Sequence, residues 1–178
     1  MSILKIARMG HPILREEAVA LTKEQLAYSE VQRLIDDMFD TLDEYDGVGL
    51  AAPQVHASIR VVLLELKRGA GIRVWVNPVI TPLSEELQED FEGCLSIPDI
   101  RGSVARYNHI DVKAWDREGT EVHLELRGFA AVVAQHECDH LDGVLFIDKA
   151  NPKSLTFLEE RRRYGDYPWE EDDETGEE

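Results

Sequence analysis

Residues 129–143 constrain the fold of this chain more than any other segment. Apolar residues and two histidines recur there at the spacing of one helical face: Phe129, Val132, Val133, His136 and His140. Gly143 follows directly and is a suitable C-terminal stop for a helix. The sequence therefore predicts a helix that presents two histidines, four residues apart, beside its apolar residues.

The rest of the chain predicts one more long helix and several strands. An apolar stripe over residues 31–42 has the helical period and ends before Gly47. Two short runs rich in Val, Ile and Leu, residues 59–66 and 73–80, are bounded by Gly and Pro and indicate buried strands. Alternation over residues 110–126 indicates a hairpin with one buried face. Because strands and helices do not alternate regularly, we expect an α+β fold.

Length and charge predict one domain followed by an acidic end. The chain has 178 residues, enough to bury a single core, and we expect that domain to cover residues 1–169. Residues 170–178 carry seven acidic side chains and no basic one, so we expect a disordered tail. The formal net charge of -17 argues against nonspecific binding to nucleic acid, which depends on basic residues.

Nothing in the sequence predicts export or membrane insertion. No apolar run approaches the roughly 20 residues that a bilayer span needs, and the start of the chain lacks the long apolar region of a secretory signal. The only cysteines, Cys94 and Cys138, do not make a disulfide framework. We therefore expect a cytoplasmic protein with reduced thiols and with no membrane or nucleic-acid partner.

The two histidines of the predicted helix form a motif with chemical meaning. His136 and His140 lie at i and i+4, so both can aim an imidazole nitrogen at one metal ion. Glu137 lies beside them, where a carboxylate could take a proton from metal-bound water, as in helix-borne metalloproteases. Chance is a minority explanation for this spacing. A catalytic site of this kind usually has three protein ligands, and the spacing leaves the third open among Asp, Glu, His and Cys.

Two further segments are ambiguous when each is taken alone. Cys94 is a candidate third ligand, although a single Cys is more often a small buried hydrophobe. Cys138 faces away from the metal side of the helix and is assigned to packing. In residues 47–54, two glycines two positions apart allow close backbone approach, but for this segment alone a tight turn with ordinary glycines is the favoured explanation. That segment does not fit a dinucleotide-binding loop, because no third glycine follows.

Taken in order, three segments resemble the signature motifs of the peptide deformylases: GVGLAAPQ (47–54), EGCLS (92–96) and QHECDHLDGVLF (135–146). The resemblance extends from HPILR (11–15) to LFID (145–148), and three motifs in this order are a strong signal. It implies mixed, mostly antiparallel sheets packed around a central metal-binding HExxH helix. It also implies a hydrolase that removes the N-formyl group from the N-terminal methionine of newly synthesised polypeptides.

The resemblance implies a role for each matching residue. Cys94, His136 and His140 would hold one divalent metal ion per chain, Fe2+ in most family members, with Ni2+, Co2+ or Zn2+ as substitutes. Glu137 would act as general base and acid. The oxyanion would be stabilised by the side-chain amide of Gln54 and the backbone N–H of Leu95. The substrate would be bound by Val48, Gly49, Val132 and Val133, with Arg101 near the rim of the methionine pocket.

The implied partners are N-formylmethionyl nascent peptides, and the implied state is a monomer. Some bacterial family members dock on the ribosome through a basic C-terminal helix. Residues 161–163 are arginines here, but the acidic run that follows weakens the case for that contact. Two other classes remain. A zincin-type metallopeptidase would leave Cys94 and Gln54 unexplained, and a noncatalytic relative that binds peptides or the ribosome would usually have lost Glu137 or Gln54.

Overall fold

The computed structural model describes residues 2–165, so the predicted acidic tail lies outside the described residues. The described elements follow one another in this order: η1 (Pro12–Arg15), α1 (Lys23–Leu26), α2 (Ser29–Glu44), β1 (Gly49–Ala51), η2 (Ala52–Val55), β2 (Val61–Leu64), β3 (Arg73–Pro82), β4 (Leu87–Cys94), β5 (Ile97–Tyr107), β6 (His109–Trp115), β7 (Glu121–Arg127), α3 (Phe129–Leu141), η3 (Phe146–Asp148), η4 (Pro152–Ser154), β8 (Thr156–Phe157) and α4 (Leu158–Tyr164). Within this range, no helix is both long enough and apolar enough to cross a membrane.

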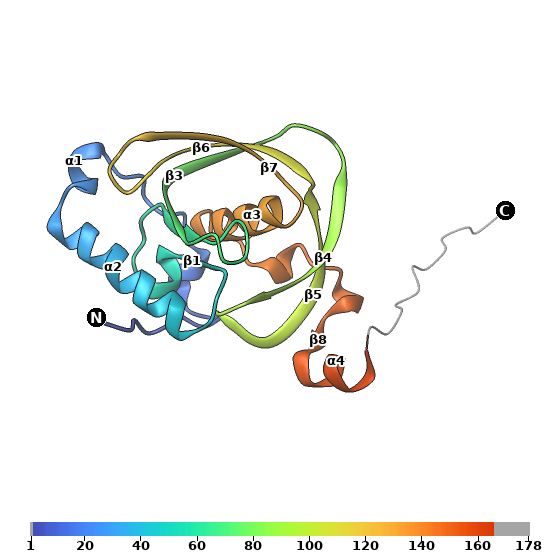
Figure 1. The fold of residues 1–178 in the computed structure, drawn as a ribbon. Helices are drawn as coiled ribbons and strands as arrows, with labels where there is room; N and C mark the ends of the chain where they lie inside the picture. The colour runs from blue at the N-terminus through green and yellow to red at the C-terminus, as the bar shows by residue number, and fades with distance from the viewer. Residues whose placement is uncertain (1, 166–178) are drawn as a thin grey trace.

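Two antiparallel sheets surround helix α3, which lies near the centre of the molecule in Figure 1. One sheet has five strands in the order β1-β2-β3-β6-β7, and the other has three in the order β4-β5-β8. Helix α3 contacts β1, β2, β3 and β7 of the first sheet and β5 of the second. The predicted α+β class with mostly antiparallel sheets is confirmed, and a parallel pairing occurs at an isolated bridge between Val19 and Ile59.

Helix α3 is buried because its sequence is apolar on more than one side. Every residue from 131 to 138 is buried, and the helix packs with strand residues such as Trp75 and Ile110 in one core. The predicted stop is confirmed, since Gly143 has a φ of 70° and a side chain there would meet the backbone of Arg15. This burial fixes the helix that carries both histidines.

Strand β2 explains why the first predicted strand reads as a continuous apolar run. Val61 and Leu63 belong to the core under helix α2, while Val62 and Leu64 belong to the core around α3. A strand covered on both faces has no polar side, so it does not alternate. The apolar stripe predicted over residues 31–42 lies on helix α2 and covers the face of β2 that carries Val61 and Leu63. The strand is shorter than the predicted run and spans Val61–Leu64.

The long β4–β5 hairpin was not predicted from the sequence. Strand β4, LQEDFEGC, is mostly exposed at its start and becomes buried only near Cys94, so it shows no apolar alternation. Its pairing with β5 runs from Leu87 opposite Tyr107 to Cys94 opposite Ile97, with an irregularity between Glu92 and Cys94. This hairpin carries Cys94 to the face of α3, so the element missed by the sequence is one that builds the site.

Candidate active site

Cys94, His136 and His140 bring three metal-ligand types together. One donor atom from each lies within 4.8 Å of the other two, and Cys94 Sγ is 3.2 Å from His140 Nε2. All three side chains are buried, the cysteine at the end of β4 and the histidines on α3. One thiolate and two imidazoles form a donor set that suits iron, zinc and similar divalent ions. These residues therefore fit a metal ion.

The charges around Cys94 favour its thiolate, which is the form that binds metals. Burial by itself would raise the pKa of this thiol, but attraction to His140 and hydrogen bonding with His136 outweigh burial and lower the pKa well below its usual range. Burial would lower the pKa of His136, yet its contacts with Cys94 and Glu92 raise that pKa. Without a metal, these shifts favour a Cys94 thiolate beside a protonated His136. A bound metal would take the place of the proton on the imidazole.

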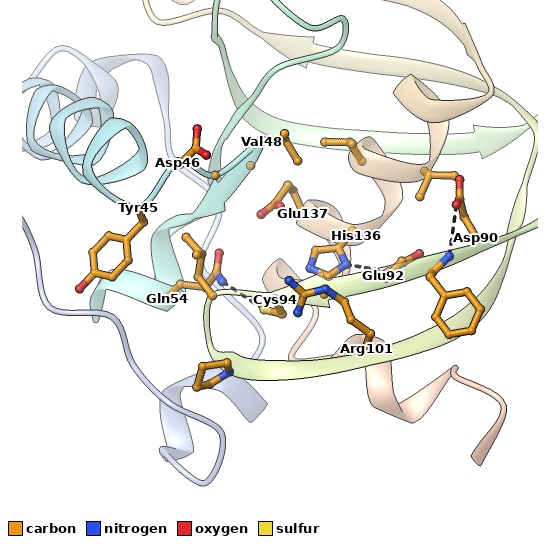
Figure 2. Close-up of a pocket in the computed structure, with 18 of the residues that line it drawn as sticks. Tyr45, Asp46, Val48, Gln54, Asp90, Glu92, Cys94, Arg101, His136 and Glu137 are labelled. Carbon is orange, nitrogen blue, oxygen red and sulfur yellow. Dashed lines mark hydrogen bonds and ion pairs between the residues drawn. The ribbon is translucent and has the colours of Figure 1, made fainter. Parts of the chain in front are cut away.

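Glu92 holds the far side of the His136 ring. Its Oε2 lies 2.7 Å from His136 Nδ1, as drawn in Figure 2. Because an ionised carboxylate can only accept, Nδ1 donates this bond, and Nε2 is the nitrogen left for a metal. Burial would raise the pKa of Glu92, but hydrogen bonds from Arg106 and His136 lower it to about 2. The carboxylate is therefore charged in the folded protein.

A buried arginine binds the carboxylate of Glu92 on the side away from the triad. Arg106, 2% exposed, donates from Nε to Glu92 Oε1 at 2.7 Å and from Nη2 to Glu92 Oε2 at 2.9 Å. Its Nη1 donates to Asp139 on α3 at 2.5 Å, and Asp139 also accepts from Lys149 at 2.7 Å. No role for Glu92 or Arg106 was predicted from the sequence. Glu92 precedes Cys94 by two residues on one strand, which was the available signal, whereas no pattern marked Arg106.

Glu137 lies beside the triad with one carboxylate oxygen unpaired. Its Oε2 is buried and has no hydrogen-bond partner among the described residues. His140 Nδ1 is likewise buried and without a partner in that range. Burial raises the pKa of Glu137 to about 7, although His136 and His140 act in the opposite direction. A carboxylate that titrates near neutral pH can both accept and return a proton.

Gly49 lies directly against the carboxylate of Glu137. A Cβ at position 49 would collide with that carboxylate, so the backbone here approaches Glu137 as closely as only a glycine allows. Gly49 itself begins strand β1, and a turn lies just before the two glycines, at residues 45–46.

We expect Gly49→Ala to reduce kcat by about 10²-fold or more, because a displacement near 1 Å at a catalytic group can cost that much. The added methyl group would push the Glu137 carboxylate away from the triad. The measurement is kcat with metal content and melting temperature determined on the same sample. Retained metal and a small change in melting temperature are expected, and turnover at the wild-type rate would contradict the assigned contact.

Gln54 has its amide fixed in one orientation. Oε1 accepts from the backbone N–H of Ala51 at 2.8 Å, so Nε2 faces the other way. Nε2 donates to Ser96 Oγ at 3.2 Å and approaches Cys94 Sγ at 3.4 Å. Figure 2 shows this amide directed at the cysteine. The donor end of Gln54 is therefore held next to the triad.

These side chains line a cavity of about 490 Å³. All the site residues expected from the sequence contribute to its lining except His140, which is buried beside Cys94. Val48, Val132 and Val133 supply apolar lining, and Leu95 lies in the turn between β4 and β5. Several exposed lining residues had no predicted role in the site: Arg8, Tyr45, Asp46, Asp90, Asp99 and Phe129. They carry no motif, and only the fold brings them together.

Arg101 and Cys138, both named from the sequence, differ in how they lie relative to this cavity. The guanidinium of Arg101 packs over Gly93, where any side chain would collide with it, and it donates to the backbone oxygen of Ile100 at 2.8 Å. Cys138 is buried outside this cavity, and burial raises the pKa of its thiol. Cys138 therefore belongs to the packing of α3, as its position on the helix predicts.

An α+β fold that holds a Cys/His/His triad next to a buried glutamate defines a metal-dependent hydrolase. The polypeptide deformylase family model matches residues 3–155. The chain belongs to the peptide deformylase family, whose members are metal-dependent hydrolases that remove N-formyl groups. The function predicted from the three motifs is confirmed at this level, and a zincin-type peptidase is not favoured.

Individual relatives agree along almost their whole length. The peptide deformylase of Heliobacterium modesticaldum is 47% identical over 150 residues, which cover 84% of this chain and 95% of the relative. The crystal structure of peptide deformylase from Thermotoga maritima has a TM-score of 0.80 and 39% identity, covering 85% of this chain and all of that one. A Met-Ala-Ser-bound class I type b peptide deformylase from Acinetobacter baumannii has a TM-score of 0.79 and 37% identity, covering 84% and 99%.

Proposed function

We propose that this chain removes the formyl group from the N-terminal methionine of nascent polypeptides at the cavity that contains Cys94, His136 and His140. The proposal rests on three groups of side chains that face the same cavity. The triad, the unpaired oxygen of Glu137 and the donor end of Gln54 all meet at this cavity. Support also comes from the relative solved with Met-Ala-Ser bound.

Cys94, His136 and His140 would hold the metal. A divalent ion at this position supplies Lewis-acid chemistry, since it polarises a carbonyl and makes a neighbouring water a stronger nucleophile near neutral pH. Glu137 takes the proton of the attacking water and gives it to the departing amine, a role that suits a carboxylate with a pKa of about 7. The products are formate and a free N-terminal methionine.

Gln54 Nε2 and the Leu95 backbone N–H stabilise the negative charge that develops on the formyl oxygen. Such donors act most strongly when they are held in place before the reaction begins. The bond from Ala51 to Gln54 Oε1 provides this restraint. Val48, Val132 and Val133 form the apolar surface for the methionine side chain, next to the backbone of Gly49, and Arg101 lies at the rim.

We expect Gln54→Ala to lower kcat by about 10²–10³-fold, the loss seen when one oxyanion donor is removed from comparable sites. KM should change much less, because the donor acts mainly on the transition state. The matched control is Ser96→Ala, which removes the hydroxyl acceptor of Gln54 Nε2 and leaves its other acceptor, Cys94 Sγ, in place. Equal losses of kcat in the two variants would show that Gln54 acts by packing against the turn between β4 and β5 rather than on the substrate.

We propose Fe2+ as the native metal, with Ni2+, Co2+ or Zn2+ as substitutes. The thiolate of Cys94 makes the iron form vulnerable, because iron and thiolate are both oxidised in air. We expect the iron form to lose activity in air faster than the nickel form. The measurement is activity against time for both forms of anaerobically purified protein, and equal lifetimes would contradict oxygen lability.

The deciding test of the function is formate release from formyl-Met-Ala-Ser by anaerobically purified protein, run beside peptide-bond cleavage of Met-Ala-Ser. Formate release without cleavage is expected. Cleavage without formate release would support a zincin-type peptidase. Absence of both reactions in protein that retains its metal would support a noncatalytic peptide-binding relative.

We also propose a monomer that acts in the cytoplasm, where a reduced thiolate persists. Ribosome binding through residues 161–163 of α4 stays a separate hypothesis.

A further inference from the structure

The N-terminal segment, residues 4–9, runs from helix α2 to the turn between β4 and β5 (Figure 1). It is anchored at its start, where the backbone N–H of Leu4 donates to Thr41 Oγ1 on α2 at 2.8 Å. The backbone N–H of Ala7, a buried residue, then donates to the backbone oxygen of Gln54 at 2.7 Å. The segment is therefore fixed against the element that carries the first proposed oxyanion donor.

The next two residues of the segment bind the turn that carries the second donor. Arg8 Nη1 donates to the backbone oxygen of Leu95. The backbone N–H of Met9 donates to the backbone oxygen of Ser96 at 2.9 Å. These two acceptors are the only residues between the end of β4 and the start of β5. Both carbonyl groups of the turn are therefore held by the N-terminal segment.

The turn needs these contacts, because the hairpin alone does not fix it. Two-residue hairpin loops usually adopt type I′ or II′ turns, which match the twist of the strands and require a positive φ. Neither Leu95 nor Ser96 has a positive φ. The pairing register also shifts next to the turn, between Glu92 and Cys94. The bonds from the N-terminal segment therefore supply a restraint that the pairing of β4 with β5 does not provide.

We propose that Arg8 is a positioning residue, which holds this turn so that the backbone N–H of Leu95 points at the formyl oxygen. The inference rests on the proposed function, to which the donor role of Leu95 belongs. An oxyanion donor acts most strongly when its direction is set before the reaction begins. The guanidinium binds the carbonyl group of the same residue whose N–H is the donor, and a charged donor makes a stronger hydrogen bond than a neutral one.

The test is Arg8→Met, assayed on formyl-Met-Ala-Ser amide and on formyl-methionine amide. Methionine is also a long side chain but has no donor and no charge, and the position is exposed, so the core is not opened. We expect kcat to fall by about tenfold or more on both substrates, part of the 10²–10³-fold loss seen when an oxyanion donor is removed outright. KM should change little, because the donor acts on the transition state. Arg8→Lys can still donate to the carbonyl group and should recover most of kcat.

Arg33→Met is the matched control, because Arg33 is also exposed but lies on α2 and does not line the cavity. It should keep the wild-type kcat, and all variants should keep the wild-type metal content and melting temperature.

Wild-type kcat in Arg8→Met, or an equal fall in both methionine variants, would overturn the inference. A rise in KM confined to the longer peptide would also overturn it, because Arg8 would then bind the chain after methionine. A fall in kcat that matches a loss of metal would assign Arg8 to the stability of the triad instead. Absence of formate release by the wild type from both substrates would refute the proposed function itself.

Discussion

Glu137→Gln should give a protein that retains its metal but hydrolyses formyl peptides about 10²–10⁴-fold more slowly, the range expected when a general base is lost. Glutamine keeps the volume of the side chain next to Gly49 but cannot take a proton from water. The three ligand side chains are unchanged, so metal content should remain near one ion per chain. The measurement is kcat on formyl-Met-Ala-Ser with metal analysis of the same preparation.

Cys94→Ala provides the complementary result. It removes a ligand and leaves Glu137 intact, so activity and metal should be lost together. The two variants therefore separate proton transfer from metal binding. Near wild-type turnover by Glu137→Gln would show that another group takes the proton, and loss of metal in that variant would place Glu137 among the ligands.

The sequence predicted the parts of the site that depend on local spacing. His136 and His140 share a face because a helix places residues i and i+4 together, and the glycine pattern at 47–49 allowed a close approach to the backbone. These relations follow from helix and strand geometry alone. Cys94 was one candidate for the third ligand, and the resemblance to a family selected it, because no spacing rule connects it to residues more than 40 positions away.

The sequence did not predict the contacts that depend on how distant strands pair. Strand β4 was missed because its outer half is polar on both sides. Arg106 therefore could not be connected to Glu92, although the register of β4 and β5 brings their regions together. Asp46 and Asp99 were missed for the same reason, because they share a cavity without sharing a segment. Charge alone does not mark a residue when 36 of the side chains are acidic.

Arg106→Met should lower the free energy of unfolding by about 3–5 kcal/mol, the loss typical when one partner of a buried ion pair is removed. Glu92 would keep only His136 as a partner, and Asp139 only Lys149. Urea unfolding of the metal-loaded protein measures the change. Glu92 has a lowered pKa of about 2, so its stabilising contribution is present above its ordinary pKa of 4.5 and is lost as the pH falls towards 2. The difference between wild type and variant should therefore narrow in that pH window.

The double variant Glu92→Met/Arg106→Met distinguishes stability from metal binding. Replacing both members of a buried ion pair with apolar side chains is often neutral or stabilising, so much of the lost unfolding free energy should return. Metal affinity should not return, because His136 Nδ1 would still lack its carboxylate, and losing such a partner typically costs about 10–100-fold in affinity. A double variant that regained stability and wild-type affinity together would show that Glu92 and Arg106 serve only the fold. Regained stability with weakened affinity would show that the ion pair also orients the imidazole of His136 towards the metal.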